Sequence, residues 1–167
     1  SVASRGLGDV YKRQPLALTH CVSAYPCPYE IMNLDFMVEL SNKYNGVCVP
    51  ITCDLSSLVG IEYFVKRVGE KEEAIDFLIN NAGAAWGGPY DEFPEVGWDK
   101  VMDLNVKSLF FLTQKLTEML KLRASSDDPS RVINIGSIDG LNVPAFETYS
   151  YSTCLLYTSD AADDLLC

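Results

Sequence analysis

Three short apolar runs, separated by helix-like segments, constrain the fold of this chain more than any other feature of its sequence. The runs cover residues 47–53, 75–79 and 131–136, and each is rich in Val or Ile and ends at a small polar residue. Strands that alternate with helices at this spacing predict βαβ units and a parallel sheet. Because the runs are apolar on both faces, we expect helices on both sides of the sheet. The fold class predicted is therefore α/β, with a doubly wound parallel sheet.

Polar residues at the ends of these runs indicate a site. Asp54 follows the first run, the sequence Asn-Asn-Ala-Gly at 80–83 follows the second, and Ser137 follows the third. The carboxyl ends of parallel strands meet at one sheet edge, which is where open α/β sheets bind ligands. Helix capping and turn chemistry explain any one of these residues equally well. Three strands that share the pattern favour a ligand site.

Helical spacing fills the segments between the runs. It predicts helices over residues 31–43, from a cap at Ser56 or Ser57 to about Glu70, and within 95–124. The longest of these has an apolar stripe made of Trp98, Val101, Met102, Leu109, Leu112, Leu116, Met119 and Leu120.

Asn105 lies on this apolar stripe, where a buried amide needs hydrogen-bond partners. An Asn satisfied by nearby backbone is the simpler explanation of that residue alone. A further polar group, Tyr149-Ser150-Tyr151, follows Ser137. Tyr and Ser hydroxyls at one sheet edge can donate hydrogen bonds to a carbonyl oxygen. A Tyr of ordinary pKa, about 10, is a weak acid–base catalyst unless a cation lowers that pKa.

Composition excludes several classes of function. The 167 residues correspond to about one domain and are 48% apolar and 22% charged, a typical globular mixture. The net charge of −10 predicts no nucleic-acid partner, because phosphate binding depends on Lys and Arg. No apolar run approaches the roughly 18 residues of a membrane span, so no membrane association is expected. The single histidine, His20, lies near Cys21 and Cys27 at a spacing that matches no standard zinc pattern, and we expect no metal.

The two ends of the chain have an unusual coding property. Asp9–Gln14 (DVYKRQ) and Cys154–Ser159 (CLLYTS) can be encoded by opposite strands of one oligonucleotide, which resembles a transposase end sequence used in sequencing libraries. We therefore predict that 1–14 and 154–167 are adapter translations with few core contacts, natural termini being the alternative.

The remaining chain divides into two parts. Residues 15–29 have no sustained period; they could contain a short strand around 16–22, or be untranslated, intronic or frameshifted sequence. Residues 30–153 form the predicted domain. Cys48 and Cys53 are expected to be small buried hydrophobes in a reducing compartment, consistent with a cytoplasmic protein.

In order and spacing, the motifs resemble the short-chain dehydrogenase/reductase family. The resemblance rests on Asn80-Asn81-Ala82-Gly83 closing a strand, Asn105-Val106 in the next helix, Ser137 closing the following strand, and Tyr151 beyond it. The text around residues 79–114, with RVINIGSIDG, further resembles 3-oxoacyl reductase-like members, including the rhamnolipid-biosynthesis type. The resemblance implies a Rossmann-type sheet, here incomplete, with the first βα unit and the C-terminal part missing.

The resemblance also implies roles for individual residues. Asp54 and the Leu55 backbone would contact the adenine of a nicotinamide dinucleotide. The segment Asn81, Ala82 and Gly83 would line its adenosine ribose and phosphate side. The catalytic set would be Asn105, Ser137 and Tyr151: Tyr151 the proton donor in reduction, Ser137 the hydrogen-bond donor to the substrate oxygen, and Asn105 the holder of a helix distortion and of a water in the proton relay.

Two departures from the family pattern are as informative as the matches. Tyr-x-x-x-Lys would place a Lys at position 155, where this chain has Leu155, and no Gly-rich turn follows a first strand. The expected activity is hydride transfer between NADP or NAD, with NADP favoured, and a carbonyl or hydroxyl of a small-molecule or acyl-thioester substrate. We expect it in a longer parent protein that forms a homodimer or homotetramer, and we expect this chain itself to be inactive. A non-catalytic binding module of the same fold is the alternative.

Overall fold

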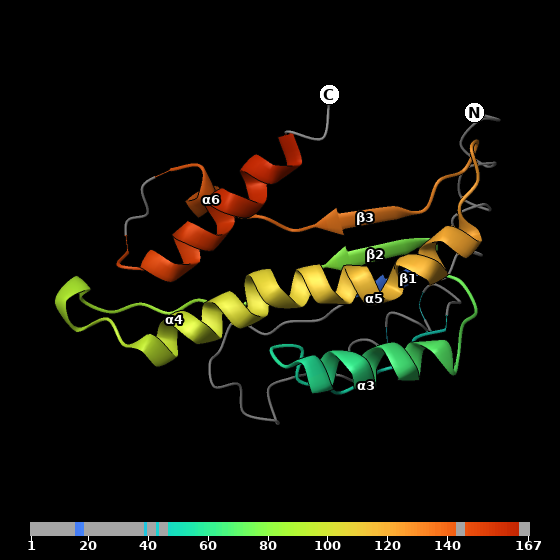
Figure 1. The fold of residues 1–167 in the computed structure, drawn as a ribbon, viewed down its shortest axis with the longest axis horizontal. Coiled ribbons are helices and arrows are strands. Elements are labelled where there is room, and N and C mark those ends of the chain that lie inside the picture. Colours follow the sequence, from blue (N-terminus) through green and yellow to red (C-terminus); the bar gives the residue numbers. More distant parts are fainter. Residues whose placement is uncertain (1–15, 19–38, 40–42, 44–46, 143–145, 164–167) are drawn as a thin grey trace.

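Three parallel strands form one sheet (Figure 1). The computed structural model describes residues 16–18, 39, 43, 47–142 and 146–163. The strands are β1 (Leu16–Leu18), β2 (Phe77–Asn80) and β3 (Arg131–Asn134), in the order β1-β2-β3.

The first residues of the three strands lie opposite one another in the sheet. Leu16 pairs with Phe77, and Phe77 pairs with Arg131. The predictions of parallel strands at 75–80 and 131–136 are confirmed, as is a short strand within 16–22. The arrowheads of β2 and β3 in Figure 1 point toward the part of the molecule that holds α4 and α6.

The predicted strand at 47–53 is wrong for the described residues, because the segment has no regular secondary structure. Pro50 lacks the N–H that a ladder needs, and Val47 is 93% exposed. In the described part of the chain, the neighbour of β2 on that side is β1, and no strand flanks β1 on its other edge. Ile51 and Cys53 of this segment are partly buried and pack against the main core. The expectation that Cys48 and Cys53 are buried is wrong, because both are only half-buried.

Helix α3 (Leu58–Gly69) begins at the cap that the sequence predicts. The Ser57 hydroxyl accepts a hydrogen bond from the Gly60 amide at 3.1 Å, which satisfies one of the amides that a helix start leaves unpaired. The predicted helix at 31–43 falls outside the described residues, apart from Glu39 and Lys43, which are helical.

The predicted long helix is one continuous helical rod in three parts. Helix α4 (Glu95–Met102) leads into a π-helical turn, η3 (Asp103–Lys107), and then into α5 (Ser108–Arg123). A π-turn has the effect of one extra residue in an α-helix and changes the direction in which the following side chains point. On α5 the stripe residues Leu112, Leu116 and Leu120 are buried and Leu109 and Met119 are half-buried, whereas Trp98 on α4 is 39% exposed.

The main core lies between α3, β2 and α5. Its fully or nearly buried members are Ile61, Phe64, Val68, Ile75, Leu78, Leu112, Leu116 and Leu120. Helices α3 and α5 lie side by side in Figure 1. All four residues of β3 are exposed, so the prediction of helices on both faces is wrong for β3 in the described part of the chain.

A second, smaller apolar cluster joins α4 to α6 (Tyr149–Asp163). Val101, Cys154 and Leu155 are its buried members, with Trp86 packed against them. The prediction that the C-terminal tail makes few core contacts is therefore wrong for Cys154 and Leu155, which are 1% and 6% exposed. Helix α6 continues through Asp163, because the tail sequence has no helix breaker in this stretch.

Among the helices in the described ranges, none combines the length and the apolar character that crossing a bilayer requires.

Candidate functional site

Two asparagines end neighbouring strands at the same level of the sheet. Asn80 and Asn134 pair directly in the register, and the Asn80 Nδ2 group donates to Asn134 Oδ1 at 2.9 Å and to Thr113 Oγ1 at 3.2 Å. The Ile135 amide then donates to the Asn80 carbonyl at 3.0 Å. The chain thus leaves β2 toward Asn81 and leaves β3 toward Ser137 from the same edge of the sheet, as the sequence predicts.

Asn105 joins the loop after β2 to the π-turn. Its Oδ1 atom accepts from the Ala84 amide at 2.8 Å, and its Nδ2 group donates to the Ala84 carbonyl at 2.9 Å. An Asn side chain that is only 9% exposed needs such partners, and the π-turn places it in the middle of the turn where it meets the loop. Gly83 lies beside it: a Cβ there would sit 3.4 Å from Asn105 Oδ1.

The network extends from Asn105 to helix α6. Asn105 Nδ2 also lies 3.3 Å from Cys154 Sγ, and the Cys154 thiol donates to the Tyr151 carbonyl at 3.0 Å. Both donor hydrogens of Asn105 are therefore engaged by protein atoms. A relay water at this residue would have to donate to its Oδ1. Burial raises the pKa of the Cys154 thiol, partly offset by the hydrogen bond from Asn105.

Cys154 is the residue that the sequence analysis missed. The sequence places this residue in a tail outside the domain, whereas in the structure it connects Asn105 to the backbone of Tyr151. The signal that could have found it is the spacing of Tyr151, Cys154 and Leu155, which is the i, i+3, i+4 pattern of one helix face.

Ser137 begins a short 3-10 turn, η4 (Ile138–Gly140), at the end of the segment that follows β3. Its hydroxyl accepts from the Asp139 amide at 3.3 Å and is half-buried. Gly140 packs against the backbone of Leu155 on α6, where a Cβ would meet the Leu155 carbonyl carbon at 2.8 Å. This close approach brings η4 against the helix that carries Tyr151, one turn before Leu155.

Asp54 and Leu55 stand apart from this network. Asp54 Oδ1 accepts from the Ser56 amide at 3.0 Å and from its hydroxyl at 2.6 Å, an arrangement typical of a local turn. Leu55 packs on the main core. Burial, and then the negative charge of Asp54, raise the pKa of the neighbouring Cys53 thiol.

The residues present fit a dinucleotide in part. Asn81 is exposed, and Ala82 and Gly83 are half-buried, so the loop after β2 lies open at the sheet edge that binds ligands in such folds. At position 155 a buried aliphatic side chain stands where a cation would hold the nicotinamide ribose. Within the described residues, no three side chains among His, Cys, Asp and Glu gather closely enough to hold a metal ion.

A parallel sheet with polar loops at its carboxyl edge is the architecture of a Rossmann-type α/β protein. A family model described as short chain dehydrogenase matches residues 3–154, and the chain belongs to that family. The match begins inside the segment 1–14 that the sequence assigns to an adapter.

Individual relatives and structures agree with the family. The chain is similar to the rhamnolipids biosynthesis 3-oxoacyl-[acyl-carrier-protein] reductase of Pseudomonas aeruginosa, with 42% identity over 106 residues, which are 64% of this chain and 41% of that protein. It is 31% identical over 153 residues to human dehydrogenase/reductase SDR family member 11, covering 90% of this chain and 57% of that protein. The chain thus spans about half the length of these curated relatives.

The solved structure of the Pseudomonas aeruginosa RhlG/NADP active-site complex superposes with a TM-score of 0.74. Its identity to this chain is 35%, over 83% of this chain and 54% of that one. The NADH-dependent reductase A1-R′ complexed with NAD superposes with a TM-score of 0.70 at 23% identity, over 86% of this chain and 58% of that one, a likeness of fold.

Proposed function

We propose that this chain is part of a longer protein that transfers hydride between a nicotinamide dinucleotide and a carbonyl or hydroxyl group. A 3-oxoacyl thioester is the substrate class to test first, because a 42% identical relative is named as a 3-oxoacyl-[acyl-carrier-protein] reductase. NADP is the favoured cofactor, because a 35% identical structure is titled as an NADP complex. A neighbour complexed with NAD keeps the second cofactor in the test.

The observation that carries this proposal is the pair of hydrogen bonds between Asn105 and Ala84, which holds the loop after β2 against the π-turn. The same turn packs against α6, the helix that holds the proposed proton donor. Catalytic groups must be held in place to act, and a side chain on a helix with buried supports is better positioned than one on a loop.

Each residue has a defined part in the proposal. Tyr151 would donate a proton to the substrate oxygen during reduction, while Ser137 donates a hydrogen bond that stabilises the charge developing there. Asn105 would position the loop and α6. Asp54, Leu55 and the Asn81–Gly83 loop would hold the dinucleotide, which would supply the hydride when bound.

This 167-residue chain by itself should not turn over a carbonyl substrate. The family pattern that this chain resembles has a Lys four residues after the catalytic Tyr, and Leu155 provides no cation at that position. Loss of effective acid–base catalysis costs about 10²–10⁴-fold in rate. The absence of a cation at position 155 also supports the alternative, a non-catalytic binding module of the same fold.

The test measures nicotinamide absorbance with ketones and 3-oxoacyl thioesters. In the full-length protein, Tyr151→Phe should abolish turnover and leave nucleotide affinity nearly unchanged, while Ser137→Ala should act mainly on turnover. Tyr63→Phe, on an exposed face of α3, is the matched control and should keep full activity. Tyr149→Phe tests whether the other tyrosine of the Tyr149-Ser150-Tyr151 group is the proton donor instead. Turnover by the 167-residue chain, or an active Tyr151→Phe variant, would contradict these assignments.

The proposal includes assembly. We propose a homodimer or homotetramer for the full-length protein, because large apolar side chains on α5 remain exposed, among them Phe110 at 58%. A monomer by sedimentation at micromolar concentration would contradict it. A reducing, cytoplasmic setting is proposed from the thiols of Cys48, Cys53 and Cys154, which form no disulfide in the described part.

A further inference from the structure

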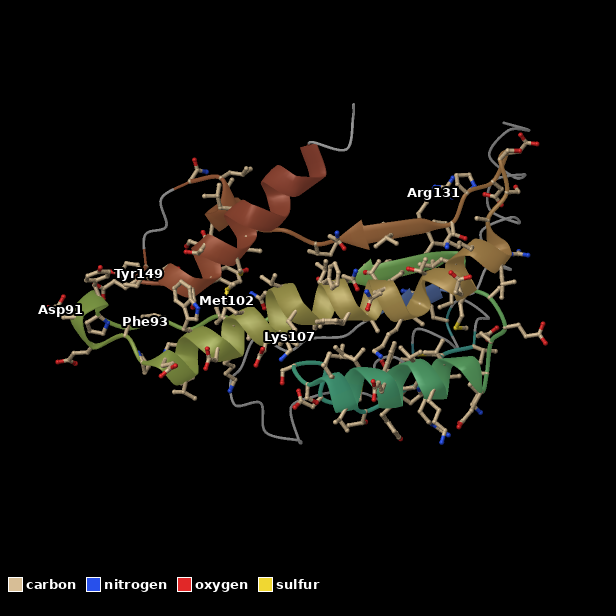
Figure 2. The ribbon with its side chains drawn as sticks, in the orientation of Figure 1. Asp91, Phe93, Met102, Lys107, Arg131 and Tyr149 are labelled. Carbon is tan, nitrogen blue, oxygen red and sulfur yellow. The ribbon has the colours of Figure 1, made fainter. Side chains whose placement is uncertain are left out.

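An open hollow lies outside the network of Asn105, between the start of α4 and the first turn of α6. Its volume is about 400 Å³, within the range of small-molecule sites. The residues that line it are Tyr90, Phe93, Pro94, Glu95, Trp98 and Tyr149. Figure 2 shows Phe93, Tyr149 and the nearby Asp91 gathered at this end of the molecule.

The aromatic rings of the hollow stand at steep angles to one another. The Tyr149 ring meets the Tyr90 ring at a centroid distance of 5.5 Å and an angle of 72°. It meets the Phe93 ring at 5.7 Å and 82°. Rings that meet edge to face are not stacked, so each ring keeps at least one face that the other does not cover. These faces carry partial negative charge, which attracts cations.

The charged groups around the hollow are acidic. Glu95 is in its lining, and Asp91, Glu92 and Glu147 are exposed neighbours in the sequence. The negative charges of Glu147 and Asp91 contribute, after burial, to a raised pKa of Tyr149.

The positive end of α4 opposes this acidity only weakly. A helix N-terminus carries about half an elementary positive charge, and Glu95 lies in the first turn. The labelled cations Lys107 and Arg131 lie away from this end in Figure 2. No Lys or Arg is among the described residues that line the hollow. The charged side chain in the lining of the hollow is therefore the acidic Glu95.

We propose that this hollow binds an organic cation of the alkylammonium class, with its apolar substituents against the rings of Tyr90, Trp98 and Tyr149 and its charge near Glu95. The rings supply apolar contact and cation–π attraction, and the carboxylates supply charge complementarity. This site is independent of the proposed hydride transfer, because none of its lining residues belongs to the proposed catalytic or nucleotide-binding set.

The experiment titrates choline, and separately its uncharged isostere in which carbon replaces nitrogen, into the 167-residue chain. Isothermal calorimetry and the chemical shifts of the tryptophan indole protons report binding. Choline should bind about tenfold more tightly than the isostere, and added salt should weaken choline alone. Equal affinity for the two would overturn the proposal in favour of a plain apolar hollow. Absence of saturable choline binding would overturn it as well.

Two variants locate the binding. Glu95→Gln should weaken choline severalfold and leave the isostere unchanged, whereas Trp98→Leu should weaken both ligands. The matched controls are Glu118→Gln and Tyr63→Leu, exposed positions on α5 and α3, which should bind choline like the unaltered chain. Because Glu95 and Trp98 are both substantially exposed, neither change should unfold the chain, and circular dichroism checks this. Unaltered choline affinity in both site variants would refute the assigned location.

Discussion

The two apolar clusters of this protein differ in what they contain. The cluster between α3, β2 and α5 buries eight large apolar side chains. The cluster between α4 and α6 buries only Val101, Cys154 and Leu155, and the amide of Asn105 passes beside it. The first resembles an ordinary hydrophobic core, while the second combines a few apolar contacts with a polar network. The comparison indicates that stability comes mainly from the first cluster and the geometry of the candidate site from the second.

The largest effect is expected in the first cluster. Leu116→Ala should lower the free energy of unfolding by about 2–5 kcal/mol, because it removes a side chain with 0% exposure and leaves a cavity. Denaturant titration followed by circular dichroism measures the change. Leu122→Ala, at a residue that is 73% exposed on the same helix, should stay within about 0.5 kcal/mol of the unaltered chain. Similar losses at the two positions would contradict the division between the clusters.

A smaller loss is expected in the second cluster. Asn105→Ala should cost about 1–3 kcal/mol, because it leaves the amide and carbonyl of Ala84 without their side-chain partner. Hydrogen exchange at the Ala84 amide should accelerate more than exchange in β2. Gln114→Ala, at an exposed position on α5, is the control. Unchanged Ala84 exchange would show that the network does not hold the loop.

A pH effect distinguishes the second cluster further. Burial raises the pKa of Cys154, so the folded protein keeps its thiol protonated where the unfolded chain ionises. Stability should therefore fall as the pH rises past the ordinary thiol pKa of 9.0. In the Cys154→Ala variant, stability should fall less steeply as the pH rises. The fall that remains is expected from Cys53 and Tyr149, whose pKa values are also raised. Parallel curves of stability against pH for the two proteins would contradict the assignment.

The smallest expected effect has the opposite sign. The Ser150 hydroxyl is fully buried and has no hydrogen-bond partner among the described residues. Ser150→Ala should raise the free energy of unfolding by about 1 kcal/mol, because it removes an unsatisfied polar group. Ser152→Ala is the matched change on the same helix, and it should lose stability because the Ser152 hydroxyl donates to the Thr148 carbonyl at 3.1 Å. Thermal denaturation compares the two, and a loss at Ser150 equal to that at Ser152 would refute the expectation.

Local patterns in the sequence predicted a large part of the fold. The strands β2 and β3, the cap at Ser57 and the continuous helical rod all depend on neighbours within a few residues. The segment 47–53 has the composition of a strand, but whether a strand forms depends on a partner elsewhere in the chain. Trp98 belongs to the stripe only if one helical period continues through the rod, and the π-turn interrupts that period.

The candidate site was predictable to a different extent. That Asn81 and Ser137 leave the same sheet edge follows from parallel strands, and Asn105 was identifiable as a polar residue on an apolar stripe. The spacing of Tyr151, Cys154 and Leu155 predicts a shared helix face, but the contact of Cys154 with Asn105 was not predictable, because it depends on how α6 packs against the π-turn. The assignment of Tyr151 as proton donor stays a prediction.

The number of residues in the π-turn determines how far α4 is rotated about the helix axis relative to α5. A single-residue deletion within Asp103–Lys107 would rotate α4 by about 100° relative to α5, since an α-helix has about 3.6 residues per turn. Gly97, where the ring of Trp86 approaches too closely for any Cβ, would turn away from that ring, and Val101 would leave Cys154. The number of residues in this turn therefore determines the rotation of α4, which packs in the second cluster with the candidate site, relative to α5, which packs in the main core. Substitutions in the π-turn can preserve this rotation, but an insertion or a deletion there cannot.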